Sequence, residues 1–166
     1  PAAYWSASRR DAAVERLASA ASRQTVRLKL LPPVAPNFDG GRGAYESLTR
    51  SDATAVVAFN DFQAAGLLVA AQEVGRSVPG SLSVVGSDGL VFATMTSPPL
   101  TTVAAPLEEV GHTARRRLTD RLAGRPGPMV TTLQPRLVVR ATTAAPDAAP
   151  VRPARPNRQR SGERPT

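Results

Sequence analysis

The stretch Ala53–Val103 alternates strand-like and helix-like patterns, and this alternation restricts the chain to a small set of folds. The apolar run Val56–Phe59 is followed by a helical pattern over Phe62–Val74, which ends at a glycine, the residue type expected just past a helix. Leu82–Val85 is a second apolar run, closed by the polar turn Gly86–Gly89. Short apolar strands that alternate with helices are typical of a parallel sheet with helices on both faces. The sequence therefore predicts an α/β fold.

Polar residues follow each of these two apolar runs. Asn60 and Asp61 come directly after the first run, and Asp88 comes after the second. In open α/β sheets, ligands bind outside the carboxyl ends of the strands, which is where these side chains are expected. The pattern indicates a ligand site rather than a catalytic one.

Composition excludes several classes of protein. The 166 residues fit one domain plus a tail, and the absence of cysteine excludes disulfides, thiolate metal sites and cysteine nucleophiles. No apolar run approaches the ~20 residues that a membrane-spanning helix needs. His112, the one histidine, is expected on the solvated side of an arginine-rich helix, and Gly40–Gly43 lacks the Lys-Ser/Thr ending of a phosphate loop. We therefore expect no enzyme activity, no metal, no cofactor and no membrane partner.

The net charge of +8 would suit a nucleic-acid-binding protein, because clustered arginines can neutralise phosphates. Part of this charge lies in residues 147–166, where five arginines stand against Asp147 and Glu163. This segment is rich in proline and has hardly any large apolar residues, so we expect a disordered tail. The charge is therefore a weak argument for nucleic-acid recognition by the folded part.

Five further elements are predicted: a helix over Ser6–Arg23, a strand over Val26–Leu31, a helix over Gly41–Thr49, a helix over about Leu107–Leu122 and a final strand over Gln134–Arg140. The fourth of these has a proline at its start, glutamates in its first turn and arginines later, an order that suits the helix dipole. Its apolar stripe consists of Leu107, Val110, Ala114, Leu118 and Leu122.

Several short motifs occur along the chain in a specific order and spacing. They are Ala58-Phe59-Asn60-Asp61 at the start of a helix, Val78-Pro79 before Ser83–Gly86 and Asp88, then Pro98–Val103, and finally Leu137–Arg140 before Thr142-Thr143. Together they resemble the LacI/GalR family of bacterial transcription regulators. The resemblance covers about residues 1–146 and implies the second, Rossmann-like lobe of a type I periplasmic-binding-protein-like sensor domain.

Members of this family begin with a helix-turn-helix headpiece, a hinge helix and a first lobe. The resemblance therefore implies a sensor domain truncated at its N-terminus, which would bind DNA only through a headpiece that this chain does not contain. It also implies that helix 107–122 crosses to the first lobe, so we expect its apolar stripe to be exposed here.

The resemblance assigns effector contacts to Asp88, Asn60, Arg10 and Phe38, and Ser6 would share the helix face of Arg10. A carboxylate accepts hydrogen bonds from vicinal sugar hydroxyls, a guanidinium offers a rigid fork of donors, and an aromatic ring can stack on a sugar or base. Each residue also has a structural alternative. Asp88 suits a turn, Asn60 suits a helix cap, Arg10 suits a surface position, and Phe38 suits the cover of a core edge.

The family pairs its second lobes, and the matching surface here contains Phe62, Leu90, Phe92 and Met95. A self-complementary apolar patch of this kind would form a homodimer. The alternative is a short helix that folds these side chains onto its own lobe. The expected function is effector sensing in a cytoplasmic regulator, with a sugar as the first candidate and a purine as the second. A sugar-binding protein of an ABC transport system and a non-functional remnant are the alternatives.

Overall fold

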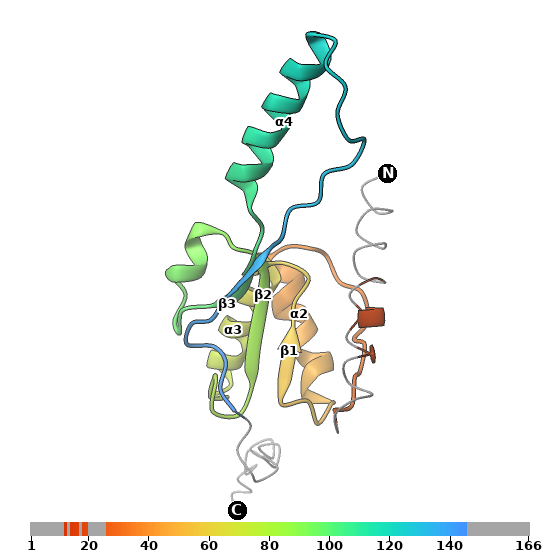
Figure 1. Ribbon diagram of the computed structural model, residues 1–166. Coiled ribbons are helices and arrows are strands. Elements are labelled where there is room, and N and C mark those ends of the chain that lie inside the picture. Colours follow the sequence, from red (N-terminus) through yellow and green to blue (C-terminus); the bar gives the residue numbers. More distant parts are fainter. Residues whose placement is uncertain (1–11, 13, 17, 20–25, 146–166) are drawn as a thin grey trace, which may run out of the picture.

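The computed structural model describes residues 12, 14–16, 18–19 and 26–145 (Figure 1). Its sheet has the strand order β1-β2-β3-β4, with the first three strands parallel and β4 antiparallel to β3. This mainly parallel sheet confirms the predicted α/β class. The elements are, in chain order, α2 (Phe38–Thr49), β1 (Ala55–Val57), α3 (Asp61–Glu73), β2 (Ser83–Asp88), the 3-10 helix η1 (Val91–Thr94), β3 (Thr101–Ala104), α4 (Leu107–Leu122) and β4 (Arg136–Val138).

Helix α3 shows why the local sequence folds as predicted. Asn60 caps its N-terminus, where the side-chain oxygen accepts a hydrogen bond from the backbone N–H of Gln63. Gly75 follows the C-terminus with a φ of 70°, a left-handed conformation that glycine adopts without steric cost. The observed bounds differ by one residue at each end from the predicted helix at 62–74.

The core lies among α2, α3 and the sheet, and α2 packs against α3 (Figure 1). Helices α2 and α3 approach closely because glycines stand at the crossing. A Cβ atom on Gly41 would lie 2.1 Å from the Gln63 carbonyl oxygen, and one on Gly66 would lie 2.0 Å from that of Phe38. The largest core side chains are Tyr45, Leu48, Leu67, Leu68, Leu82, Val84 and Leu100.

The two faces of the sheet differ in burial. Val84 of β2 points toward α3 and is fully buried. Val57 and Leu137 belong to the opposite face, because their register partners alternate with Val84 along β2 and β3. They are 58% and 60% exposed, so the described residues cover one face of the sheet. The sequence had predicted helices on both faces.

Helix α4 projects away from the sheet, and the chain returns beside it toward β4 (Figure 1). None of its residues is buried. The predicted exposure of its apolar stripe is confirmed, with Leu107 61%, Val110 45%, Leu118 61% and Leu122 80% exposed.

The predicted strand at Val26–Leu31 is wrong. The segment has no strand assignment, and Val26, Leu28 and Leu30 are exposed. A strand needs a neighbouring ladder, whereas the described sheet ends at β1 and residues 26–31 pair with none of its strands. The final strand also proves shorter than predicted, at Arg136–Val138.

Two predictions fall wholly or partly outside the described residues. Within the predicted helix at 6–23, the described residues 12, 14–16 and 18–19 are helical. The predicted tail at 147–166 lies outside the described part of the chain.

Candidate functional site

Asn60 and Asp88 lie at the same edge of the sheet. Val57 of β1 pairs with Val85 of β2 in parallel, and each of the two polar residues stands three positions beyond its paired valine. Asp88 is the last residue of β2 and Asn60 follows β1, so both stand at the carboxyl ends of neighbouring strands, the arrangement expected for a ligand crevice. Asp88 is partly buried and has a φ of 109°, a conformation that favours glycine.

Asn60 is 8% exposed, and both ends of its amide bind within the protein. Its Oδ1 accepts a 2.8 Å hydrogen bond from the Gln63 N–H, and its Nδ2 donates a 2.9 Å bond to the Pro36 carbonyl oxygen. Asn60 therefore caps α3, the structural alternative that the sequence offered for this residue. An amide oxygen has a second lone pair and an amide nitrogen a second proton, so each atom can still bind a ligand group.

Phe38 is held next to α3 by hydrogen bonds that Asn60 and Gln63 donate to the segment before it. Besides the bond from Asn60 to Pro36, Gln63 Nε2 donates a 2.8 Å bond to the Ala35 carbonyl oxygen. Asn37 caps α2 by accepting a 2.8 Å bond from the Gly40 N–H. Phe38 itself is 38% exposed at the first position of α2, so part of its surface faces solvent.

Asp61 is a residue whose importance the sequence did not reveal. It is 0% exposed, and its carboxylate accepts a 2.5 Å bond from Thr102 Oγ1 and a 2.7 Å bond from the Leu90 N–H. The sequence placed Asp61 with Asn60 at the ligand edge and offered either residue as the cap of α3, whereas Asn60 is the cap and Asp61 is buried. Its partners Thr102 and Leu90 are distant along the chain, so no local pattern pointed to this role.

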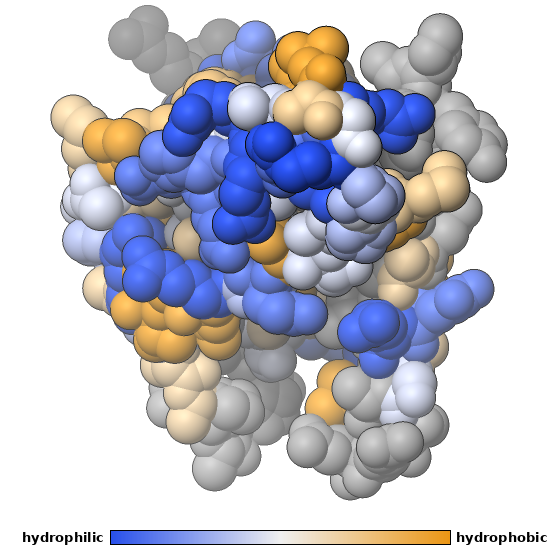
Figure 2. Space-filling model, turned by 45° about the horizontal axis from the view of Figure 1, so that its top comes forward, coloured by the Kyte–Doolittle hydropathy of each residue, from blue (hydrophilic) through white to orange (hydrophobic). Residues whose placement is uncertain are grey.

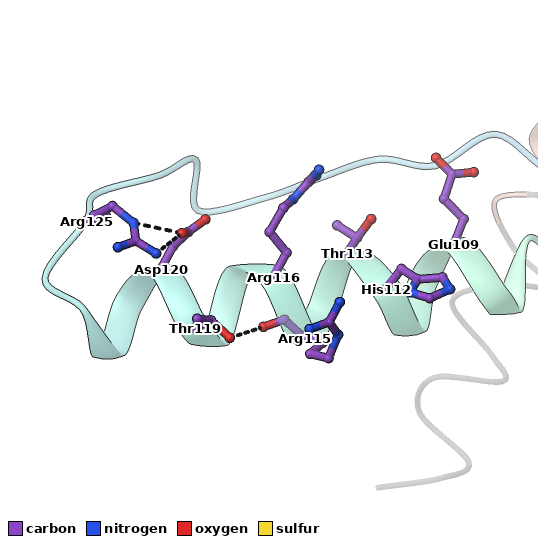
Figure 3. A pocket seen from close by; sticks show the side chains of 8 residues that line it. All are labelled: Glu109, His112, Thr113, Arg115, Arg116, Thr119, Asp120 and Arg125. Carbon is purple, nitrogen blue, oxygen red and sulfur yellow. Dashed lines mark hydrogen bonds and ion pairs between the residues drawn. The ribbon is translucent and has the colours of Figure 1, made fainter.

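The remaining predicted contacts, Arg10 and Ser6, lie outside the described residues. A shallow groove does exist on the polar side of α4, and its lining includes His112, Arg116 and Arg125 (Figure 3). Asp120 lies in this groove and accepts hydrogen bonds of 2.9 and 2.6 Å from Arg125. A second groove lies between α4 and the returning chain. Neither groove contains a predicted effector residue.

The predicted dimer surface contains both packed and exposed residues. The Phe62 and Phe92 rings stack on each other, while Val91 and Met95 are 83% and 78% exposed. Figure 2 shows the end of the molecule from which α4 projects, where hydrophobic residues form separate patches between hydrophilic ones. The short helix forecast as the alternative exists as η1, but it leaves its outer side chains in solvent.

A family model described as a periplasmic binding protein-like domain matches residues 2–143, so the chain belongs to that family. Within it, the relatives are LacI-family transcriptional regulators, and this chain covers part of their effector-binding domain. The regulator reg1 of Streptomyces lividans is 38% identical over 133 residues, which cover 80% of this chain and 39% of that protein. MalR of Streptomyces coelicolor is 38% identical over 75% of this chain and 36% of that protein.

Solved structures give the same result. A LacI family regulator from Arthrobacter sp. FB24 in complex with lactose is 37% identical with a TM-score of 0.62, over 67% of this chain and 43% of that one. The repressor ascG of Escherichia coli is 30% identical with a TM-score of 0.71, over 80% of this chain and 51% of that one. The family resemblance inferred from the motifs is confirmed.

The comparisons and the structure also test for an enzyme, a membrane-spanning helix and a metal site. The relatives are transcriptional regulators, a class without catalytic activity, which confirms the prediction that the chain is not an enzyme. In the described part of the chain, no helix has the length and apolar character needed to span a bilayer. The described residues also contain no cluster of three or more histidine or carboxylate side chains arranged to hold a metal ion.

Proposed function

We propose that this chain is the effector-sensing and dimerising portion of a cytoplasmic LacI-type regulator, and that its effector is a sugar. The observation that carries the proposal is the position of Asp88 and Asn60 at the carboxyl ends of neighbouring parallel strands in a sensor-type fold. Solved relatives with bound lactose, ribose and cellobiose support a sugar over other effectors.

The chemistry of the two residues suits a sugar. A carboxylate such as Asp88 accepts hydrogen bonds from two adjacent hydroxyls, and Asn60 offers one further donor and one further acceptor. Phe38, at the start of α2, is 38% exposed, and we assign its apolar ring to stacking on the effector. We assign Arg10 to the same site on the family pattern, and Ser6 because it would share the helix face of Arg10.

In a two-lobed sensor, we assign α4 to the contact with the first lobe. An effector that binds two lobes together shifts the equilibrium between lobe arrangements only by its difference in affinity for them. The exposed stripe of α4 is the surface we assign to the first lobe. Each of its large side chains would contribute about 1.5–3 kcal/mol on burial. We assign the homodimer contact to Phe62, Leu90, Phe92 and Met95.

A thermal-shift series tests the proposal. Lactose, ribose and cellobiose are added in turn to the chain, with adenine and guanine as the purine arm. A ligand that binds only the folded state raises the melting temperature in proportion to the logarithm of its concentration. The proposal predicts a shift with at least one sugar that Asp88→Asn abolishes. A shift with a purine alone would reassign the effector, and a sugar shift unchanged in Asp88→Asn would remove Asp88 from the site.

A further inference from the structure

Asp61 is the one charged side chain among those the structure describes as buried. Its carboxylate joins three elements, because it belongs to the first residue of α3 and binds Thr102 on β3 and the backbone of Leu90 after β2. Hydrogen bonds to a carboxylate are shorter and stronger than those between neutral groups. Asp61 is therefore a strong tie between these elements.

The hydrogen bond from the Leu90 N–H connects Asp61 to the predicted site. Leu90 stands two residues after Asp88 and directly before η1. The residue between them, Gly89, has a φ of 75°, and a Cβ atom there would lie 2.5 Å from that of Ala104. The turn Asp88–Leu90 is therefore held from two sides, by the close approach of β3 and by the Asp61 carboxylate.

A second contact joins the same two elements. Phe62, the neighbour of Asp61 on α3, stacks on Phe92 of η1 with ring centroids 4.9 Å apart. Helix α3 thus holds the start of the loop through the Asp61 carboxylate and the body of η1 through an aromatic pair.

From these contacts we propose that Asp61 is a positioning residue. It fixes the turn Asp88–Leu90 on α3, so that the Asp88 carboxylate and the apolar surface of η1 move as one unit. The description of Asp88 as an effector contact rests on the proposed function. The positioning itself concerns only the geometry of the turn.

Amide hydrogen exchange measured by NMR on the whole chain tests this proposal. The probe is the Leu90 N–H, and the internal control is the Val84 N–H, which belongs to β2, the strand before Leu90, and donates a 2.8 Å bond to the Thr142 carbonyl oxygen. In Asp61→Asn, the Leu90 N–H is expected to exchange about tenfold faster, as the loss of a bond to a charged group implies, while the Val84 N–H keeps its rate. A merely structural role would raise both rates together.

Two variants of Thr102 act on the same carboxylate without removing it. Thr102→Val removes the hydroxyl that orients Asp61 and is expected to speed exchange at Leu90, whereas Thr102→Ser keeps the hydroxyl and is expected to restore protection. These variants also decide the matter if Asp61→Asn does not fold. Unchanged exchange at Leu90, equal acceleration at Val84, or a serine variant as fast as the valine variant would each overturn the proposal.

A titration of the same samples with lactose, ribose and cellobiose separates this result from the proposed function. The absence of sugar binding would count against the function, and the exchange at Leu90 would still decide the role of Asp61. Sugar binding together with fast exchange of the Leu90 N–H in the wild-type chain would support the function and overturn the role of Asp61.

Discussion

The Phe62 ring lies 4.9 Å from the Phe92 ring, centroid to centroid, with the two planes tilted by 35°. Phe62 is still 48% exposed, and the neighbouring Val91 and Met95 are more so. An aromatic pair that packs within one lobe and leaves its outer surface in solvent is a suitable centre for contact with a second copy.

Charge placed on this surface should prevent self-association. Met95→Asp is expected to leave the melting temperature unchanged, because the side chain is 78% exposed, and to shift the sedimenting species toward the monomer. Met129→Asp, at a methionine that is 99% exposed on the chain returning from α4, is the matched control. Equal association of the wild type and Met95→Asp across a concentration series would exclude this surface as the dimer contact.

Two substitutions at Asp88 separate its role in the turn from its role in binding. Asp88→Ala and Asp88→Gly both remove the carboxylate and should weaken sugar binding by about ten- to a hundred-fold, the equivalent of about 1.5–3 kcal/mol. Because the backbone has a φ of 109°, glycine should be at least as stable there as alanine. Stability is measured by urea unfolding. A large loss of stability in both variants, with sugar binding retained, would favour the turn-forming role.

Two glycines of α2 should respond to alanine in opposite directions. Gly43 has no atom within 4 Å of an added Cβ, so Gly43→Ala should stabilise the fold by about 0.5–1 kcal/mol through helix propensity. Gly41→Ala would press on the Gln63 carbonyl and should destabilise it by about 1–3 kcal/mol. Thermal unfolding followed by circular dichroism compares the two. A similar melting temperature for both variants would contradict the close α2–α3 crossing.

An exposed ion pair joins the segment before α2 to the loop between α2 and β1. The Arg27 guanidinium, which hydrogen-bonds to Asp52, lowers the pKa of that carboxyl below its ordinary value of 3.8, helped by a backbone hydrogen bond. A depressed folded-state pKa means that any stabilisation is present above the unfolded pKa and is lost as the pH falls through the folded value. Carboxyl NMR titration should show the pKa of Asp52 rising toward 3.8 in Arg27→Gln or in high salt. An unshifted Asp52 in that variant would show that the ion pair does not form in solution.

The sequence predicted the elements that local patterns define. Helix α3 has a capping asparagine, a terminal glycine and a dense apolar run, and helix α4 has a proline start and a regular stripe, so both were located within one residue. The prediction of a strand at Val26–Leu31 was wrong because a strand also needs a partner strand, and the pattern of apolar residues does not reveal one. Asp61 was missed for the same reason, since its partners on β3 and after β2 are distant along the chain.

The central claim is that a sugar binds at the strand ends that carry Asn60 and Asp88, and NMR mapping of a sugar titration tests it most directly. Lactose, ribose and cellobiose are added at millimolar concentrations to the isotopically labelled chain, and amide shifts are followed residue by residue. The account predicts shifts concentrated at Asn60, Asp88 and the start of α2, with none along the groove that contains His112 and Arg116. Shifts confined to that groove on α4, or no shift with any of the three sugars, would contradict it.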